Sequence, residues 1–125
     1  MSFSSRLGFR NGSKSPTSSS SSINKTHTRI LLVRHGETDW NVIHRLQGIT
    51  DTQLTETGLL QAARVAERLS KDPHIHHVYS SDLTRAFKTA SEIIIARQLE
   101  ENDIKVDERL REFDLGIFAG HSQVS

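Results

Sequence analysis

The apolar residues of this chain fall into short runs and helical repeats that begin near residue 29. Residues 29–33 are an aliphatic run between polar residues, which predicts a strand buried on both faces. Residues 56–71 repeat apolar side chains every three or four positions after Thr55, which is a suitable N-cap. This spacing predicts an amphipathic helix, and Pro73 prevents its continuation.

The same two patterns return in the second part of the chain. Residues 77–80 predict a second short strand, residues 83–94 repeat apolar side chains at helical spacing, and residues 104–107 predict a further strand. Strands and helices that alternate in this way predict an α/β fold with a parallel sheet and right-handed crossovers. Ligands then bind beyond the carboxyl ends of the strands. Because two or three strands make a thin sheet, we expect an incomplete domain.

The start of the chain differs in composition from the rest. Ten serines lie within residues 1–22, and residues 1–29 carry five basic and no acidic side chains, against 11 basic and 15 acidic ones in the remainder. Such a segment cannot bury enough apolar surface to fold. We interpret residues 1–28 as a disordered tail or, alternatively, as a chloroplast or mitochondrial transit peptide, and residues 29–125 as a partial domain. Without a transit peptide, the expected location is cytoplasmic.

The composition also excludes several classes of function. The chain has no cysteine, which excludes a disulfide framework, a thiolate metal site and a cysteine nucleophile. No apolar stretch approaches the roughly 20 residues that span a bilayer. The acidic balance of residues 30–125 argues against nucleic acid binding. We interpret the neighbouring His74, His76 and His77 as surface residues, because they lack carboxylate support, and we expect no metal.

The segment Arg34-His35-Gly36-Glu37 combines groups that suit phosphate chemistry. The planar guanidinium of an arginine can bind a phosphate with two parallel hydrogen bonds. A neutral imidazole can attack phosphorus, and neighbouring positive charge lowers the pKa of a histidine and so favours that neutral form. A glycine at position 36 would let the backbone approach a ligand closely. Taken alone, however, a histidine after a strand is more often a structural or surface residue.

This segment belongs to a longer pattern that resembles the histidine phosphatase superfamily, which includes cofactor-dependent phosphoglycerate mutases. The blocks that carry the resemblance are residues 31–41; residues 45–48 with 51–55, Gly58, Gln61 and Ala62; residues 80–86 with Thr89 and Ala90; and residues 110–116. The resemblance implies a phosphoglycerate mutase-like, three-layer α/β/α fold with a mostly parallel sheet. Within the superfamily, the sequence resembles most the small plant-like phosphatases.

The resemblance also implies roles for particular residues. It makes His35 the nucleophile that accepts the phosphoryl group and Glu112 the acid that protonates the leaving oxygen. The residues that it implies for binding the phosphate and the substrate are Arg34, Asn41, Gln47, Gly48 and Arg85.

Three of these residues have plainer interpretations. Arg85 can be an exposed charge at the start of a helix, and Asn41 can cap a loop. Glu112 can form a surface ion pair with its neighbour Arg111, which would contribute little to stability.

The later part of the family pattern is not found in this chain. Members of the family carry a second catalytic histidine far downstream, and nothing here corresponds to it. His121 follows Glu112 too closely and has no strand before it. Ala119 stands at a position that is acidic in the family's phosphatases. We therefore expect a truncated domain that holds the N-terminal part only.

The resemblance implies hydrolysis of a phosphomonoester through a phosphohistidine intermediate on His35, without a metal or another cofactor. One alternative is a phosphoglycerate mutase, and another is a catalytically inactive fragment. The expected partner is a small phosphorylated metabolite rather than nucleic acid or a membrane, and a homodimer is left open.

Overall fold

The computed structural model describes residues 27–123. Two units are distinguished, with the boundary after Leu31, and the fold below is that of the unit that begins at Leu32. The prediction of a tail or transit peptide over residues 1–28 falls almost entirely outside the described residues.

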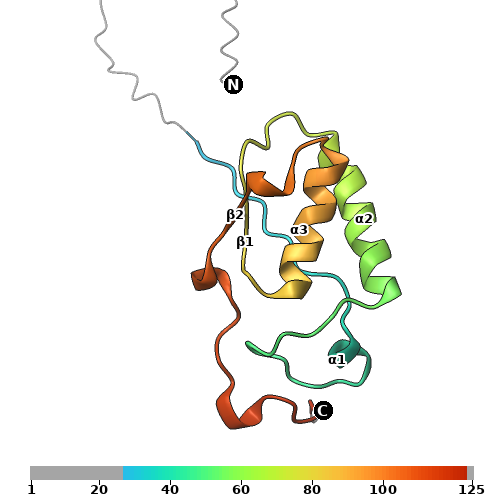
Figure 1. Cartoon of the computed structure of the whole chain (residues 1–125), viewed down its shortest axis with the longest axis vertical. Helices are drawn as coiled ribbons and strands as arrows, with labels where there is room; N and C mark the ends of the chain where they lie inside the picture. The colour runs from blue at the N-terminus through green and yellow to red at the C-terminus, as the bar shows by residue number, and fades with distance from the viewer. Residues whose placement is uncertain (1–26, 124–125) are drawn as a thin grey trace, which may run out of the picture. The chain divides into compact units, whose positions relative to one another are not determined.

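The sheet consists of two short parallel strands, β1 (Val78–Ser80) and β2 (Ile104–Val106). Val78 pairs with Ile104 and Ser80 with Val106. Figure 1 shows the two strands side by side. The strands predicted at residues 77–80 and 104–107 are confirmed, and so is the parallel sheet.

The predicted strand over residues 29–33 is wrong. These residues are in no strand, and the side chain of Leu32 is 94% exposed. A strand needs a neighbouring strand that pairs with its N–H and C=O groups, and the strand pairs and bridges of residues 27–123 do not include this segment. The aliphatic composition is therefore not sufficient to form a strand here.

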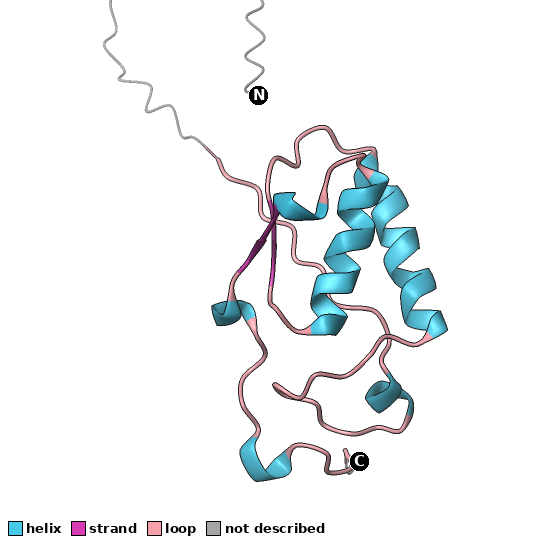
Figure 2. Ribbon diagram, viewed as in Figure 1, coloured by secondary structure: helices cyan, strands magenta, loops and turns pink. Residues whose placement is uncertain are grey.

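The two longer helices lie where the sequence predicts them; they pack against each other, and one of them also covers the sheet. Helix α2 (Glu56–Ser70) is capped by Thr55, whose Oγ1 accepts a hydrogen bond from the N–H of Gly58. It packs through the small side chains of Ala62 and Ala66 against α3 (Thr84–Ala96), and α3 packs against both strands (Figure 2). The core between α3 and the sheet contains Val78, Phe87, Ala90, Ile94 and Ile104.

Arg97, at the C-cap of α3, joins the two helices at that end. Its Nη1 donates to the carbonyl oxygens of Leu69 at 3.1 Å and Asp72 at 2.8 Å, and its Nη2 donates to that of Ile75 at 2.9 Å. The guanidinium thereby ties the end of α3 to the last turn of α2 and to the loop that follows it.

The remaining elements are short. Helix α1 (Asp39–Val42) precedes α2, while three 3₁₀ turns, η1 (Glu101–Asp103), η2 (Glu108–Leu110) and η3 (Gly116–Phe118), occupy the later part. The main chain after η3 bonds back to the loop after α1, with Gly120 N donating to Leu46 O at 2.8 Å. None of the described helices combines the length and apolar character that crossing a membrane requires.

Candidate active site

The loop that carries His35 is fixed to the start of α2 by two glycines. A Cβ added at Gly36 would lie 2.3 Å from the carbonyl oxygen of Gly58, and one added at Gly58 would lie 2.0 Å from that of Glu37. The N–H of Thr55 also donates to Glu37 O at 3.0 Å. The sequence suggested that Gly36 makes room for a ligand, but the backbone of α2 fills the space where its side chain would be.

His35 is half-buried, and its ring is oriented by its own loop. Its Nδ1 lies 2.7 Å from the carbonyl oxygen of Gly36. Because that carbonyl can only accept, Nδ1 carries the proton in the neutral ring, and Nε2 keeps a lone pair.

The surroundings of His35 favour its neutral form. Burial lowers the pKa of His35 below its ordinary value of 6.5, while the hydrogen bond to Gly36 opposes this, and the charges of Arg85 and Arg34 lower the pKa further. Glu112 opposes these charges more weakly. The imidazole is thus kept neutral at pH values where an ordinary histidine begins to be protonated.

A cavity of about 250 Å³ opens beside this ring. Its lining consists of Arg34, His35, Gly36, Glu37, Asn41 and Gln61. Asn41 also caps α1, since its Oδ1 accepts from the N–H of Thr38 at 3.0 Å. Asn41 therefore acts as a cap and also lines the cavity, while its role in binding phosphate stays a prediction.

Arg85 is buried at the first turn of α3, with 2% of its surface exposed. Its Nη1 and Nη2 donate to the carbonyl oxygens of Thr50 and Gly48, each at 2.7 Å. Its Nη2 also lies 3.4 Å from Oε2 of Glu112. The interpretation of Arg85 as an exposed charge is wrong, because the loop before α2 surrounds it.

The turn that receives Arg85 is built by Gln47 and Gly48. Oε1 of Gln47 accepts from the hydroxyls of Thr38, at 2.8 Å, and Thr52. Gly48 has a φ of +53°, which favours glycine, and its carbonyl faces Arg85. Neither residue lines the cavity, and in the structure both support Arg85. Their role in binding substrate stays a prediction.

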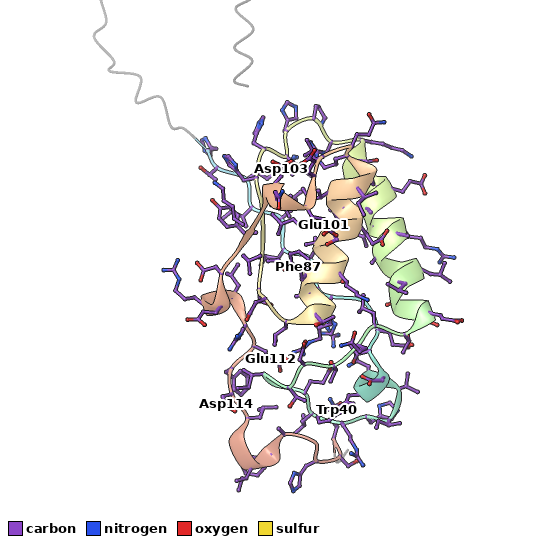
Figure 3. All side chains as sticks on the ribbon, in the orientation of Figure 1. Trp40, Phe87, Glu101, Asp103, Glu112 and Asp114 are labelled. Atoms are coloured by element: carbon purple, nitrogen blue, oxygen red, sulfur yellow. The ribbon has the colours of Figure 1, made fainter. Side chains whose placement is uncertain are left out.

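Glu112 lies beyond the N-terminal end of α3 (Figure 3), on the segment between η2 and η3. The carboxylate partner of its neighbour Arg111 is Asp82, which receives hydrogen bonds from Nε at 2.6 Å and from Nη2. A surface ion pair between Glu112 and Arg111 is therefore wrong. Glu112 pairs with Arg85, and Arg111 holds the segment to the start of α3.

The structure adds three supporting residues that the sequence analysis did not assign. Thr89 accepts from Gly36 N at 3.2 Å and donates to Arg85 O at 2.8 Å, which joins the His35 loop to α3. Asp51 accepts from the N–H and hydroxyl of Thr84, both at 2.7 Å, and so caps α3. The third is Gln61 in the cavity lining.

Two of these residues had visible signals in the sequence. Thr89 stands four residues after Arg85, which places both on one face of a helix. Gln61 is part of the second block of the resemblance. Asp51 caps a helix that begins 33 residues later, so only the structure reveals it. Among residues 27–123, no group of three histidine or acidic side chains is arranged to hold a metal ion.

Comparison with known proteins identifies the family. The family model of the histidine phosphatase superfamily (branch 1) matches residues 30–125. Phosphoglycerate mutase-like protein 4 of Arabidopsis thaliana is 50% identical over 75% of this chain and 40% of its own length. For phosphoserine phosphatase 1 of Hydrogenobacter thermophilus, the identity is 40%, over 74% of this chain and 42% of that protein.

Solved structures agree with this result. The mycobacterial glucosyl-3-phosphoglycerate phosphatase complexed with VO3 superimposes with a TM-score of 0.64 at 43% identity, over 71% of this chain and 41% of that one. Phosphoserine phosphatase of Entamoeba histolytica, in complex with 3-phosphoglyceric acid, gives 0.62 at 36% identity, over 70% and 41%. The chain spans about 40% of the length of its curated relatives. It belongs to the histidine phosphatase superfamily, branch 1.

Proposed function

We propose that this chain carries the phosphoryl-accepting part of a metal-independent phosphomonoesterase. The observation that carries the proposal is the state of His35, whose Nε2 lone pair is free in a neutral ring beside a cavity and near two arginines. Nε2 attacks phosphorus, the bond from phosphorus to the ester oxygen breaks, and a phosphohistidine forms.

The other residues stabilise charge and move the proton in this scheme. Arg34 and Arg85 bind the non-bridging oxygens, on which the negative charge of the transition state is spread. The side chain of Asn41 donates from the cavity wall, and Gln47 and Gly48 keep Arg85 in place. Glu112 donates a proton to the leaving oxygen. It then takes one from the water that attacks phosphorus and restores His35.

The first test is whether a phosphoenzyme forms. The full chain is mixed with p-nitrophenyl phosphate, and we expect p-nitrophenolate release with phosphate bound to the protein in an acid-labile, alkali-stable form on His35. The His35→Ala variant should carry none. Absence of both product and protein-bound phosphate in the unaltered chain would contradict the proposal and would favour a non-catalytic chain, which the 40% coverage of the relatives makes a serious alternative.

A phosphoglycerate mutase is the second candidate, because a probable phosphoglycerate mutase of Proteus mirabilis is 48% identical over 71% of this chain. A mutase returns the phosphoryl group to substrate instead of to water. Incubation with 3-phosphoglycerate separates the two activities, since a phosphatase releases inorganic phosphate and a mutase forms 2-phosphoglycerate.

The substrate in this proposal is a small phosphorylated metabolite, because the similar solved structures include a glucosyl-3-phosphoglycerate phosphatase and a phosphoserine phosphatase. We place the protein in the cytoplasm, or in a chloroplast or mitochondrion if residues 1–28 are a transit peptide. The N-terminal residue of the protein isolated from its cells decides between these locations. Sedimentation equilibrium tests the homodimer.

A further inference from the structure

Gln61 lines the cavity beside His35, and the proposed reaction gives it no task. It lies on α2, one turn after Gly58, and its Oε1 accepts a hydrogen bond from the N–H of Glu37 at 2.8 Å. It is thus the side chain through which α2 contacts both the loop of the nucleophile and the space in front of it.

The hydrogen bond from Glu37 fixes which way the amide of Gln61 is turned. A side-chain amide has one accepting oxygen and one donating nitrogen. Because a backbone N–H can bond only to the oxygen, Nε2 is on the side away from Glu37 N. Within residues 27–123, Nε2 has no protein acceptor, so its two hydrogens remain available to a ligand.

Asn41 presents its amide in the same way. Its Oδ1 is occupied by the N–H of Thr38, so Nδ2 is the atom that remains to donate. The guanidinium of Arg34 adds further donors to the lining. The acid of the lining, Glu37, has Oε1 engaged by the hydroxyl of Thr55 at 2.7 Å. The lining therefore offers two amide donors of fixed orientation and a guanidinium, which are groups suited to an oxyanion.

We infer that Gln61 is a further substrate-binding residue, which donates from Nε2 to an anionic oxygen of the phosphorylated molecule held beside His35. The inference rests on the proposed function. The oxygen belongs either to the phosphoryl group or to a carboxylate of the same substrate, and the two sources are separated by the choice of ligand.

Two substitutions separate the accepting and the donating function of the Gln61 amide. Gln61→Glu keeps an oxygen that can accept from Glu37 N but replaces the donor with a negatively charged acceptor. Gln61→Met removes the acceptor and the donor together. Leu60→Glu is the matched control for charge, since it adds the same carboxylate at the next position of α2, on a side chain that is 64% exposed and absent from the cavity lining.

The test is a titration of the full chain with inorganic phosphate and, separately, with phosphoserine. Binding is followed through the ring signals of His35 in protein labelled with ¹³C-histidine, assigned with the variant His35→Gln. We expect Gln61→Glu to weaken binding on the order of tenfold, the size of a lost hydrogen bond to a charged oxygen, and Leu60→Glu to change it less than about twofold. Weakening with both ligands assigns the oxygen to the phosphoryl group, and weakening with phosphoserine alone assigns it to the carboxylate.

Other outcomes overturn the inference. If Gln61→Glu binds both ligands as the unaltered chain does, while Gln61→Met displaces the His35 signals before any ligand is added, Gln61 only positions the loop. If Leu60→Glu weakens binding as much as Gln61→Glu, the weakening is a general effect of the added charge, and Gln61 makes no contact with the ligand. If neither ligand shifts His35 in the unaltered chain, the proposed function fails and this inference fails with it, a result distinct from the first two.

Discussion

The proposed nucleophile, His35, and the proposed acid, Glu112, are held in different ways. His35 and Arg85 lie in or against the helical part, where backbone packing and buried hydrogen bonds fix them. Glu112 lies on an extended segment outside any α-helix or strand, near Phe113 and Ile117, which are 72% and 82% exposed. The difference indicates that steric fit positions the nucleophile, whereas charge positions the acid.

The largest effect is expected where the packing is tightest. In Gly58→Ala the new methyl group would meet the carbonyl of Glu37, so either the loop of His35 or the start of α2 must move. We expect a loss of about 3 kcal/mol in the free energy of unfolding, measured by urea titration, together with loss of the phosphoenzyme. Thr57→Ala, at the exposed neighbouring position, should stay within about 0.5 kcal/mol of the unaltered chain. Equal effects of the two substitutions would show that Gly58 is not critical.

A smaller effect is expected for Arg85→Lys, which keeps the charge and removes the planar group. One ammonium cannot serve the carbonyls of Thr50 and Gly48 as the two Nη atoms do, and an unpaired buried carbonyl costs about 2 kcal/mol of stability. The rate of phosphoryl transfer should fall roughly a hundredfold, since an ammonium does not reproduce the oriented guanidinium that the proposal assigns to the transition state. Arg64→Lys, on the exposed side of α2, is the control and should change neither quantity. Retained stability in Arg85→Lys would mean that the buried network is unimportant.

The ion pair between Asp82 and Arg111 tests whether charge positions Glu112. Asp82→Asn weakens the link that holds the Glu112 segment against the start of α3. We expect the rate of p-nitrophenolate release to fall roughly tenfold because the acid is displaced, with the urea midpoint unchanged. The matched control is Asp107→Asn, which breaks a similar pair with Arg109 in η2. A fall in the rate for both variants, or for neither, would refute the assignment of a positioning role to Asp82.

The sequence predicted the helices well because their signals are local. The apolar spacing and the cap at Thr55 are close in sequence to the helices that they predict, and α2 and α3 both form where they indicate. The strand at residues 29–33 was predicted from composition alone, and it failed because pairing depends on a neighbour that the segment's own sequence cannot specify.

The site residues show the same division between local and distant causes. The motif made His35 and Arg85 candidates, and their roles stay predictions. It could not show that Arg85 is buried among carbonyls of the preceding loop, because those contacts join residues more than 30 positions apart. The pairing of Glu112 with Arg85 rather than Arg111 was missed for the same reason. Adjacency in sequence suggested the wrong partner, and only the path of the chain around α3 supplies the right one.

The smallest effect concerns the charge that surrounds the nucleophile. The lowered pKa of His35 means that the neutral ring should persist below pH 6.5, and phosphoryl transfer should decline only at lower pH. The unfolded chain binds a proton at this residue more readily than the folded one. The contribution of His35 to stability is therefore full above pH 6.5 and declines as the pH falls. Arg34→Gln removes one of the charges that lower the pKa.

We expect Arg34→Gln to raise the pKa of His35 only slightly, since burial, the larger cause, remains. The measurement is an NMR titration of the ring signals of His35 in the ligand-free chain. Arg45→Gln, on an exposed residue outside the cavity lining, is the control and should leave the titration unchanged. A pKa of His35 above 6.5 in the unaltered chain would contradict the neutral nucleophile. A large rise in Arg34→Gln would show that charge, rather than burial, is the main cause of the lowered pKa of His35.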